Sequence, residues 1–351
     1  MHYRELFNKV HYGNQEIFNK KLNWYFDIKN ILYQNQSKKK IISETNQLIE
    51  EYSSLKNLKE KKKKIFFKTK PISLKDYVNN KDLKFKKKIF NSINYLTKKK
   101  IHTYFNHFLI QGSLATKDYK ENWSDFDSVG VIKDEIIQNQ KQLIRLRDIL
   151  KVFYRRILKF SKFQHHGIIL FSEYDLKNFL PGYLPVEALR GKSLSIFKPS
   201  IFSVNKILKK EKNLSKEILL GRKKYLKKGI RNKYYDHHVF DNKKLSIPLK
   251  DNEKTLKQLF VHIGFMLNIP ILFLDAKGKS SHKKNSFKKF YLIIKNVEVI
   301  NFIKKHEYLR SNWSYFYKNN ISLNKKLIEY LGKNYFSNCL KTVDYCLKKI
   351  N

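Results

Sequence analysis

The chain has 351 residues, which leaves room for two domains, and a formal net charge of +44, from 74 Lys and Arg against 30 Asp and Glu. The longest uncharged run, residues 258–274, contains His262, Asn268 and Pro270 and is short for a membrane span. The N-terminus does not resemble a signal peptide, so we expect a cytoplasmic protein with no membrane partner.

The excess of positive charge has two explanations. A basic surface attracts nucleic acid and other polyphosphates, most strongly at low salt. The chain is also rich in Lys, Asn, Ile, Phe and Tyr and has alanine only at positions 115, 188 and 276, the composition that AT-rich codons produce. The charge therefore makes nucleic acid a candidate partner without establishing one.

Residues 1–100 have the pattern of a Lys-rich helical region. Apolar residues such as Leu48, Tyr52 and Leu55 recur at helical spacing. No motif that carries chemistry occurs there.

The stretch with the most chemical information is residues 108–131, FLIQGSLATKDYKENWSDFDSVGV. An apolar strand is followed by Gly112 and Ser113, a polar connection, and a second strand with Asp125 and Asp127. Side chains alternate across a strand, so the two carboxylates leave the same face. Carboxylates this close repel each other unless a cation lies between them, and oxygen ligands suit Mg²⁺ or Mn²⁺.

This order of residues resembles the nucleotidyltransferase superfamily, which includes DNA polymerase beta, kanamycin nucleotidyltransferase and the minimal nucleotidyltransferases. The family signature is apolar-Gly-Ser and then, after a short connection, Asp-apolar-Asp. The resemblance implies that Gly112 and Ser113 bind the phosphates of an NTP such as ATP. It also implies that Asp125 and Asp127 hold Mg²⁺ (or Mn²⁺) and serve in catalysis.

In the resembling family, a following strand supplies a third carboxylate, and this chain departs from that pattern. A helix is expected over residues 137–157, because apolar residues keep a helical stripe there, and then a strand over 164–171. The nearest equivalent position is His166, and the nearest carboxylate is Glu173. Three interpretations stay open: His166 is a ligand or base, Glu173 is the third ligand from a shifted register, or the site is reduced.

Residues 181–351 are expected to form a helical domain. A helical stripe from Leu256 to Met266 is expected to end at Pro270, and a basic loop follows over 275–284. In the resembling family a helical domain borders the cleft, so Lys283 and Lys284 could reach nucleotide phosphates. The alternative is a solvated loop.

Two further patterns lie in this region. Residues 231–237 fit an Arg-Asn-x₄-His pattern, which resembles the motif of the HEPN-domain ribonucleases and makes a ribonuclease element a minor alternative. Cys339 and Cys346 fall on one face of an expected helix, which predicts two buried thiols.

We therefore expect an α+β protein with three parts: a Lys-rich helical region (1–100), a small mixed-sheet nucleotidyltransferase core (101–180) and a C-terminal helical domain (181–351). The expected function is metal-dependent transfer of NMP from an NTP to an unidentified hydroxyl on a protein, a small molecule or an RNA end. The alternative is a non-catalytic nucleotide- or RNA-binding protein built on a reduced core.

Overall fold

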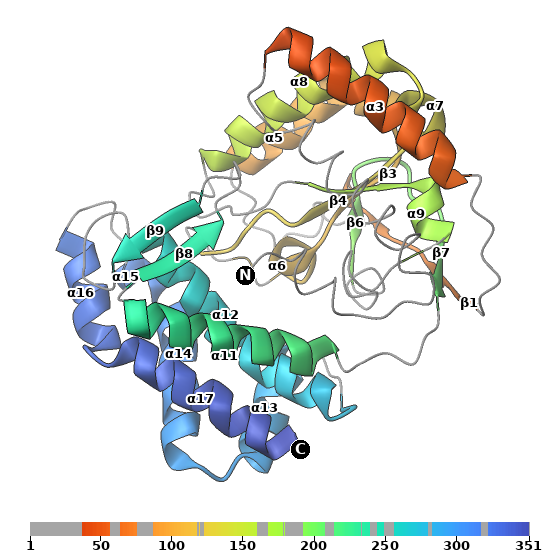
Figure 1. The fold of residues 1–351 in the computed structure, drawn as a ribbon. Coiled ribbons are helices and arrows are strands. Elements are labelled where there is room, and N and C mark those ends of the chain that lie inside the picture. The colour runs from red at the N-terminus through yellow and green to blue at the C-terminus, as the bar shows by residue number, and fades with distance from the viewer. Residues whose placement is uncertain are drawn as a thin grey trace. The chain divides into compact units, whose positions relative to one another are not determined.

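The structure is a computed structural model (Figure 1). It describes residues 37–56, 64–75, 87–117, 119, 123–159, 168–177, 179, 192–207, 214–232, 234–238, 244–248, 256–279, 283–316 and 322–350. These residues fall into two compact units, one up to Ile207 and the other from Leu214 onward. The α+β class that the sequence predicts is confirmed.

The N-terminal unit combines helices with strands. Its helices are α3 (Lys38–Lys56), α5 (Lys87–Lys98), η1 (Ile101–Thr103, a 3-10 turn), α6 (Gly112–Ala115), α7 (Asp134–Ile137), α8 (Gln140–Leu158) and α9 (Glu173–Lys177). Its strands are β1 (Lys64–Thr69), β2 (Ile72–Ser73), β3 (Phe105–Ile110), β4 (Ser128–Ile132), β5 (Ile169–Ser172), β6 (Leu194–Ser195) and β7 (Phe202–Ile207). The helical interpretation of residues 1–100 therefore missed β1 and β2.

A small mixed sheet organises this unit. Its strand order is β2-β6-β3-β4-β5, and β1 pairs with β7 in a separate antiparallel ribbon. The strand β3 is antiparallel to both β4 and β6, whereas β4 and β5 are parallel. All five residues of β4 are buried, as expected for a central strand with neighbours on both edges.

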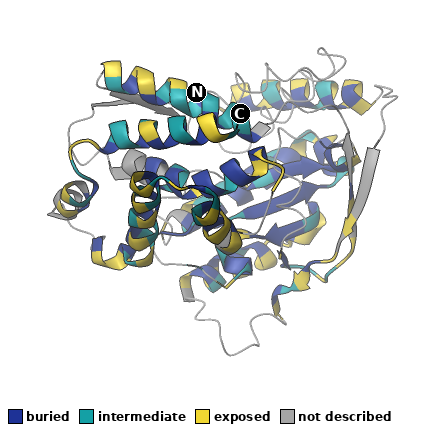
Figure 2. Ribbon diagram, turned by 90° about the horizontal axis from the view of Figure 1, so that it is seen from below, coloured by how far each residue is buried: buried dark blue, intermediate teal, exposed yellow. Residues whose placement is uncertain are grey.

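Helix α8 covers one face of this sheet through the apolar stripe seen in the sequence. The Phe153 ring packs edge-on against Phe108 of β3 at 6.2 Å and against Phe126 at 5.7 Å, between ring centroids. All three rings are at most 1% exposed. Figure 2 shows the strands as mostly buried, while the helices carry their exposed residues on the side away from the core. The core thus fixes Phe126, the residue between the two aspartates.

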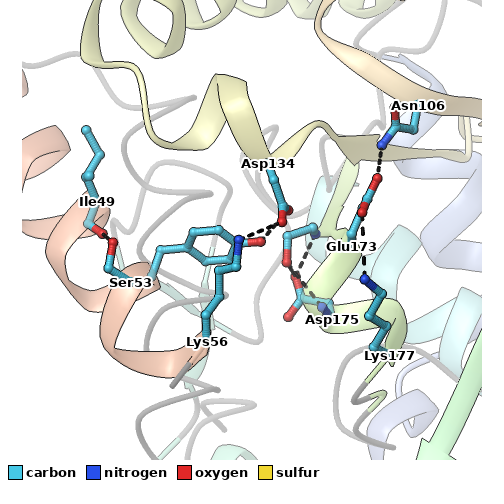
Figure 3. Close-up of polar contacts among 10 residues, drawn as sticks. Ile49, Ser53, Lys56, Asn106, Asp134, Glu173, Asp175 and Lys177 are labelled. Atoms are coloured by element: carbon cyan, nitrogen blue, oxygen red, sulfur yellow. Dashed lines mark hydrogen bonds and ion pairs between the residues drawn. The ribbon is translucent and has the colours of Figure 1, made fainter. Parts of the chain in front are cut away.

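Polar contacts fasten α3 to this core. The Tyr52 hydroxyl donates to Asp134 Oδ1 at 2.5 Å. Lys56 Nζ lies 3.0 Å from Asp134 Oδ2 (Figure 3). Burial and the adjacent Asp134 carboxylate raise the pKa of Tyr52 above its ordinary value. Tyr52 is therefore a neutral donor at any physiological pH.

A capping box sets the start of α9. The Ser172 N–H donates to Asp175 Oδ2 at 2.7 Å, and the Asp175 N–H donates to Ser172 Oγ at 3.1 Å. This reciprocal pair satisfies two backbone donors that the first turn of a helix would leave free. The strand β5 therefore ends at Ser172, and the following residue, Glu173, lies in a helix.

The C-terminal unit is mainly helical but includes a β-hairpin, and the expected start of the helical domain at residue 181 is too early, because β6 and β7 belong to the N-terminal unit. Its helices are α11 (Leu214–Asn232), α12 (Leu256–Ala276), α13 (Lys283–Ile293), α14 (Val297–Ser311), α15 (Trp313–Phe316), α16 (Ser322–Leu331) and α17 (Tyr335–Ile350). The hairpin consists of β8 (Tyr234–His238) and the antiparallel β9 (Lys244–Pro248). Within the described residues, no helix is both long and apolar enough to cross a membrane.

The expectation that Pro270 ends its helix is wrong. Helix α12 continues through Pro270 to Ala276. Proline removes one backbone donor and crowds the preceding turn, which opposes a helix. Here Met266, Ile269, Phe273 and Leu274 are all buried, so apolar packing on both sides of Pro270 offsets that cost.

The two cysteines lie buried on α17, as the sequence predicts, and neither forms a disulfide. Burial raises the pKa of Cys339 and of Cys346 to about 12. Because only the thiolate reacts, we expect almost no labelling by an aromatic disulfide reagent at pH 8, where a thiol with this pKa is ionised to only about 10⁻⁴. Both thiols should react after unfolding in denaturant.

The same thiols make the free energy of unfolding depend on pH. The unfolded chain ionises them near the ordinary value of 9.0, below the folded pKa of about 12. Their protonated form therefore supports folding below pH 9, and this contribution decreases as the pH rises toward 12. Fast labelling of the native protein at pH 8 would contradict the burial of both thiols.

Candidate functional site

The Gly-Ser turn and the aspartate segment meet at one end of the β3–β4 pair. In the ladder, Ile110 at the end of β3 pairs with Ser128 at the start of β4. The Gln111 N–H then donates to the Asp127 carbonyl oxygen at 2.9 Å. This bond extends the ladder by one step and joins the residue before Gly112 to the second aspartate.

Gly112 is needed at this position for two reasons. Its φ of +62° lies in the left-handed region, which side chains with a Cβ rarely adopt. A Cβ on Gly112 would also lie 1.8 Å from Asp127 Oδ2 and 2.7 Å from Asp127 Cγ. The Asp127 carboxylate thus occupies the space that a side chain on Gly112 would fill, so the two halves of the sequence motif are in contact.

Ser113 follows in the first turn of α6. Its Oγ is buried and makes no hydrogen bond with any residue that the structure describes. A buried hydroxyl without a partner is costly, so such groups commonly have a ligand or water as partner. A phosphate oxygen is one acceptor that this hydroxyl could serve.

Asp125 and Asp127 lie in the extended segment just before β4, rather than within the strand that the sequence predicts. Exposure alternates along it, since both aspartates are half-buried while Ser124, Phe126 and Ser128 are buried. The alternation places the two carboxylates together on the more open side, as the sequence predicts.

Tyr119 is a neighbour of this site that the motif does not identify. Its pKa is raised to about 12 by burial and by the nearby Asp125 carboxylate. The phenol is therefore a neutral donor beside an acid at physiological pH. Tyrosine is too common in this chain, with 22 copies, for the sequence alone to single out this one.

The sequence offers two candidates, His166 and Glu173, for the third acid or base of the site. His166 lies outside the described residues, and β5 is described from Ile169. Glu173 is described, and the structure does not bring it to the aspartates. Because β4 and β5 are parallel, Asp127 precedes the start of β4 while Glu173 lies beyond its end. Asp127 and Glu173 are therefore about 20 Å apart along the strand direction, at a rise of about 3.3 Å per residue.

Glu173 has other partners at that far end of the sheet. Asn106 Nδ2 donates to Glu173 Oε1, and Lys177 Nζ lies 3.9 Å from Glu173 Oε2 (Figure 3). The Lys177 side chain is 69% exposed, so this ion pair contributes little to stability. The placement gives Glu173 a local structural role.

The remaining residues singled out in the sequence belong to the C-terminal unit. Lys283 and Lys284 begin α13. Arg231 lies in the last turn of α11, and His237 lies on β8, so the Arg-Asn-x₄-His pattern is divided between a helix and a strand.

The donors at the turn fit a small divalent cation only in part. Among the described residues, no group of three His, Cys, Asp or Glu side chains is close enough to share a metal ion. Asp125 and Asp127 supply two carboxylates, and Mg²⁺ commonly binds through one or two carboxylates with water and substrate phosphates completing its shell. The donor chemistry therefore fits Mg²⁺ bound together with a nucleoside triphosphate.

Comparison of the chain with models of known protein families, with curated proteins and with solved structures gave no match. The resemblance to the nucleotidyltransferases therefore rests on the sequence motif alone.

Proposed function

We propose that this protein is a metal-dependent nucleotidyltransferase that moves an NMP from an NTP to a hydroxyl acceptor. The observation that carries the proposal is the contact between the Asp127 carboxylate and Gly112. Residues separated by the whole motif form one site with a left-handed glycine, a buried hydroxyl and two carboxylates on one side. The glycine and the hydroxyl would bind the phosphates of a metal–NTP complex, and the two carboxylates would bind its cation.

Each residue has a defined task in this proposal. The absence of a side chain on Gly112 lets the backbone approach the triphosphate, and the Ser113 hydroxyl and N–H donate to phosphate oxygens. Asp125 and Asp127 would hold Mg²⁺ or Mn²⁺, which when bound would neutralise phosphate charge and polarise the phosphorus that the acceptor attacks. The protein would contribute mainly position and electrostatics.

His166 remains the candidate for the third position because of its place in the sequence. Its imidazole would accept the proton of the attacking hydroxyl as pyrophosphate leaves. The turn and the aspartates need no such base to hold a nucleotide.

A second candidate function is nucleotide binding without turnover. It is favoured by one observation, the lack of a third metal-binding side chain near the two aspartates among the described residues. In that case the site would hold a metal–NTP complex and release no pyrophosphate.

The test is pyrophosphate release by the full chain with each of the four NTPs and Mg²⁺ or Mn²⁺. We expect release with at least one NTP, abolished by EDTA and restored by excess metal. A labelled NTP would then identify the acceptor. NTP binding without release, by a folded protein with either metal, would contradict the proposed transfer and favour the binding function.

A further inference from the structure

An exposed aromatic cluster lies at the junction of α14, α15 and α16. Phe316 is buried, 4% exposed, and three tyrosine rings surround it. The ring centroids of Tyr308, Tyr315 and Tyr330 lie 6.5, 5.2 and 4.9 Å from that of Phe316. Tyr308 and Tyr315 are 54% and 57% exposed, so packing around the buried Phe316 ring holds two large tyrosine rings at the surface.

Lysines lie directly over these rings. Lys305 Nζ is 4.7 Å from the Tyr330 ring centroid, and Lys326 Nζ is 5.3 Å from that of Tyr315. Burial lowers the pKa of Lys305 below its ordinary value, although it keeps a carbonyl partner, Leu331 O, at 3.4 Å. Cations are therefore positioned within reach of any group that stacks on the exposed tyrosines.

The charge of this segment is complementary to an anion. Residues 297–333 carry seven Lys and Arg against three glutamates. One of the three, Glu307, accepts a hydrogen bond from the Tyr291 hydroxyl. Among the residues that the structure describes, neither Lys305 nor Lys326 forms an ion pair with a carboxylate.

Exposed aromatic rings with ammonium groups beside them are suited to binding one kind of ligand, unpaired nucleotides. Nucleobases stack on aromatic side chains, and the phosphates between them need cations nearby. A duplex would offer the lysines its phosphates but would keep its bases stacked on each other and away from the rings. An apolar protein partner would pack against the rings but would offer the lysines no negative charge.

We propose that the α14–α16 surface, formed by Tyr308, Tyr315, Tyr330, Lys305 and Lys326, binds single-stranded nucleic acid. Bases stack on the exposed tyrosine rings, and the lysines neutralise the adjacent phosphates. This activity is independent of the nucleotidyl-transfer proposal, because it uses none of the residues around Gly112.

The test is fluorescence anisotropy of the full chain with a labelled oligouridine of about 12 nucleotides, a length in the range that stacking surfaces bind. The Tyr308→Ala/Tyr315→Ala variant should raise Kd at least about tenfold, because two stacking rings are lost. The Tyr308→Phe/Tyr315→Phe variant keeps both rings and should stay within about twofold of wild type. Thermal unfolding of each variant checks that the fold is kept.

Charge is tested with matched lysine variants. Lys305→Ala/Lys326→Ala should weaken binding and flatten the dependence of log Kd on log salt by about 1.4 units, since each lysine neutralises about one phosphate and each phosphate contributes about 0.7 unit on a single strand. Lys341→Ala/Lys348→Ala removes the same charge from exposed positions on α17 and should change Kd by less than about twofold.

The outcomes separate this proposal from its competitors. Equal affinity for a duplex, wild-type binding by the double alanine tyrosine variant, or no binding of oligouridine would each overturn it. The Asp125→Asn/Asp127→Asn variant should bind the oligonucleotide as tightly as wild type. If the variant loses nucleotidyl transfer but still binds the oligonucleotide, this inference stands. If the protein transfers NMP but does not bind the oligonucleotide, this inference fails and the proposed function stands.

Discussion

Asp127→Asn is expected to lower metal-dependent pyrophosphate release by at least about 10³-fold, equivalent to about 4 kcal/mol in the activation free energy. Asparagine has nearly the same shape, so it can keep the contact with Gly112 and the backbone bond to Gln111. It removes the negative charge that would hold the cation. Asp125→Asn should have an effect of the same size. The measurement is single-turnover pyrophosphate release at saturating NTP.

A matched control separates charge from stability. Glu135→Gln on α7 makes the same chemical change at an exposed position of the same unit, and should leave the rate within about twofold of wild type. All three variants should unfold at the same temperature within a few degrees. Turnover by the Asp125→Asn/Asp127→Asn double variant at the wild-type rate would exclude these aspartates as metal ligands.

Gly112→Ala should have the second large effect, on both rate and stability. The new Cβ would meet Asp127 Oδ2 at 1.8 Å, and alanine strongly disfavours the φ of +62°. The left-handed backbone costs about 1–2 kcal/mol and the displaced carboxylate about 1–3 kcal/mol more. Since the carboxylate is moved from its place beside the turn, we expect pyrophosphate release to fall at least about 10²-fold.

Gly278→Ala is the control for this substitution. Gly278 has a φ of +67° at the C-terminal end of α12, and a Cβ there would meet nothing within 4 Å. It shares the backbone strain of Gly112→Ala without the steric clash, so it should cost about 1–2 kcal/mol in the free energy of unfolding and leave the rate unchanged. Equal activity of the two glycine variants would contradict the arrangement of Asp127 over Gly112.

The strands on either side of the Gly-Ser and Asp motif were more predictable from the sequence than the rest of the sheet. The pairing of β3 with β4 follows from two nearby apolar runs, and the motif between them is local in sequence. Helix α8 follows from a long apolar stripe that ends at Ile157. In both cases a periodic pattern continues over enough residues to be distinguished from chance.

The parts that the sequence did not predict depend on distant contacts. Strands β2 and β6 have two residues each, so they have no periodicity, and they become strands only because β6 pairs with β3. Helix α12 continues past Pro270 because tertiary packing supports it. The distance of Glu173 from the aspartates follows from the direction of β5, which the sequence does not state.

The burial of Cys339 and Cys346 has a practical consequence for spectroscopy. These are the two cysteines of the chain, and both are shielded from reagents while the protein is folded. A single cysteine introduced at an exposed position, such as Glu135→Cys or Lys288→Cys, would accept a maleimide dye or a spin label selectively. Probes can therefore be attached at chosen sites in the natural background, without first replacing the native thiols.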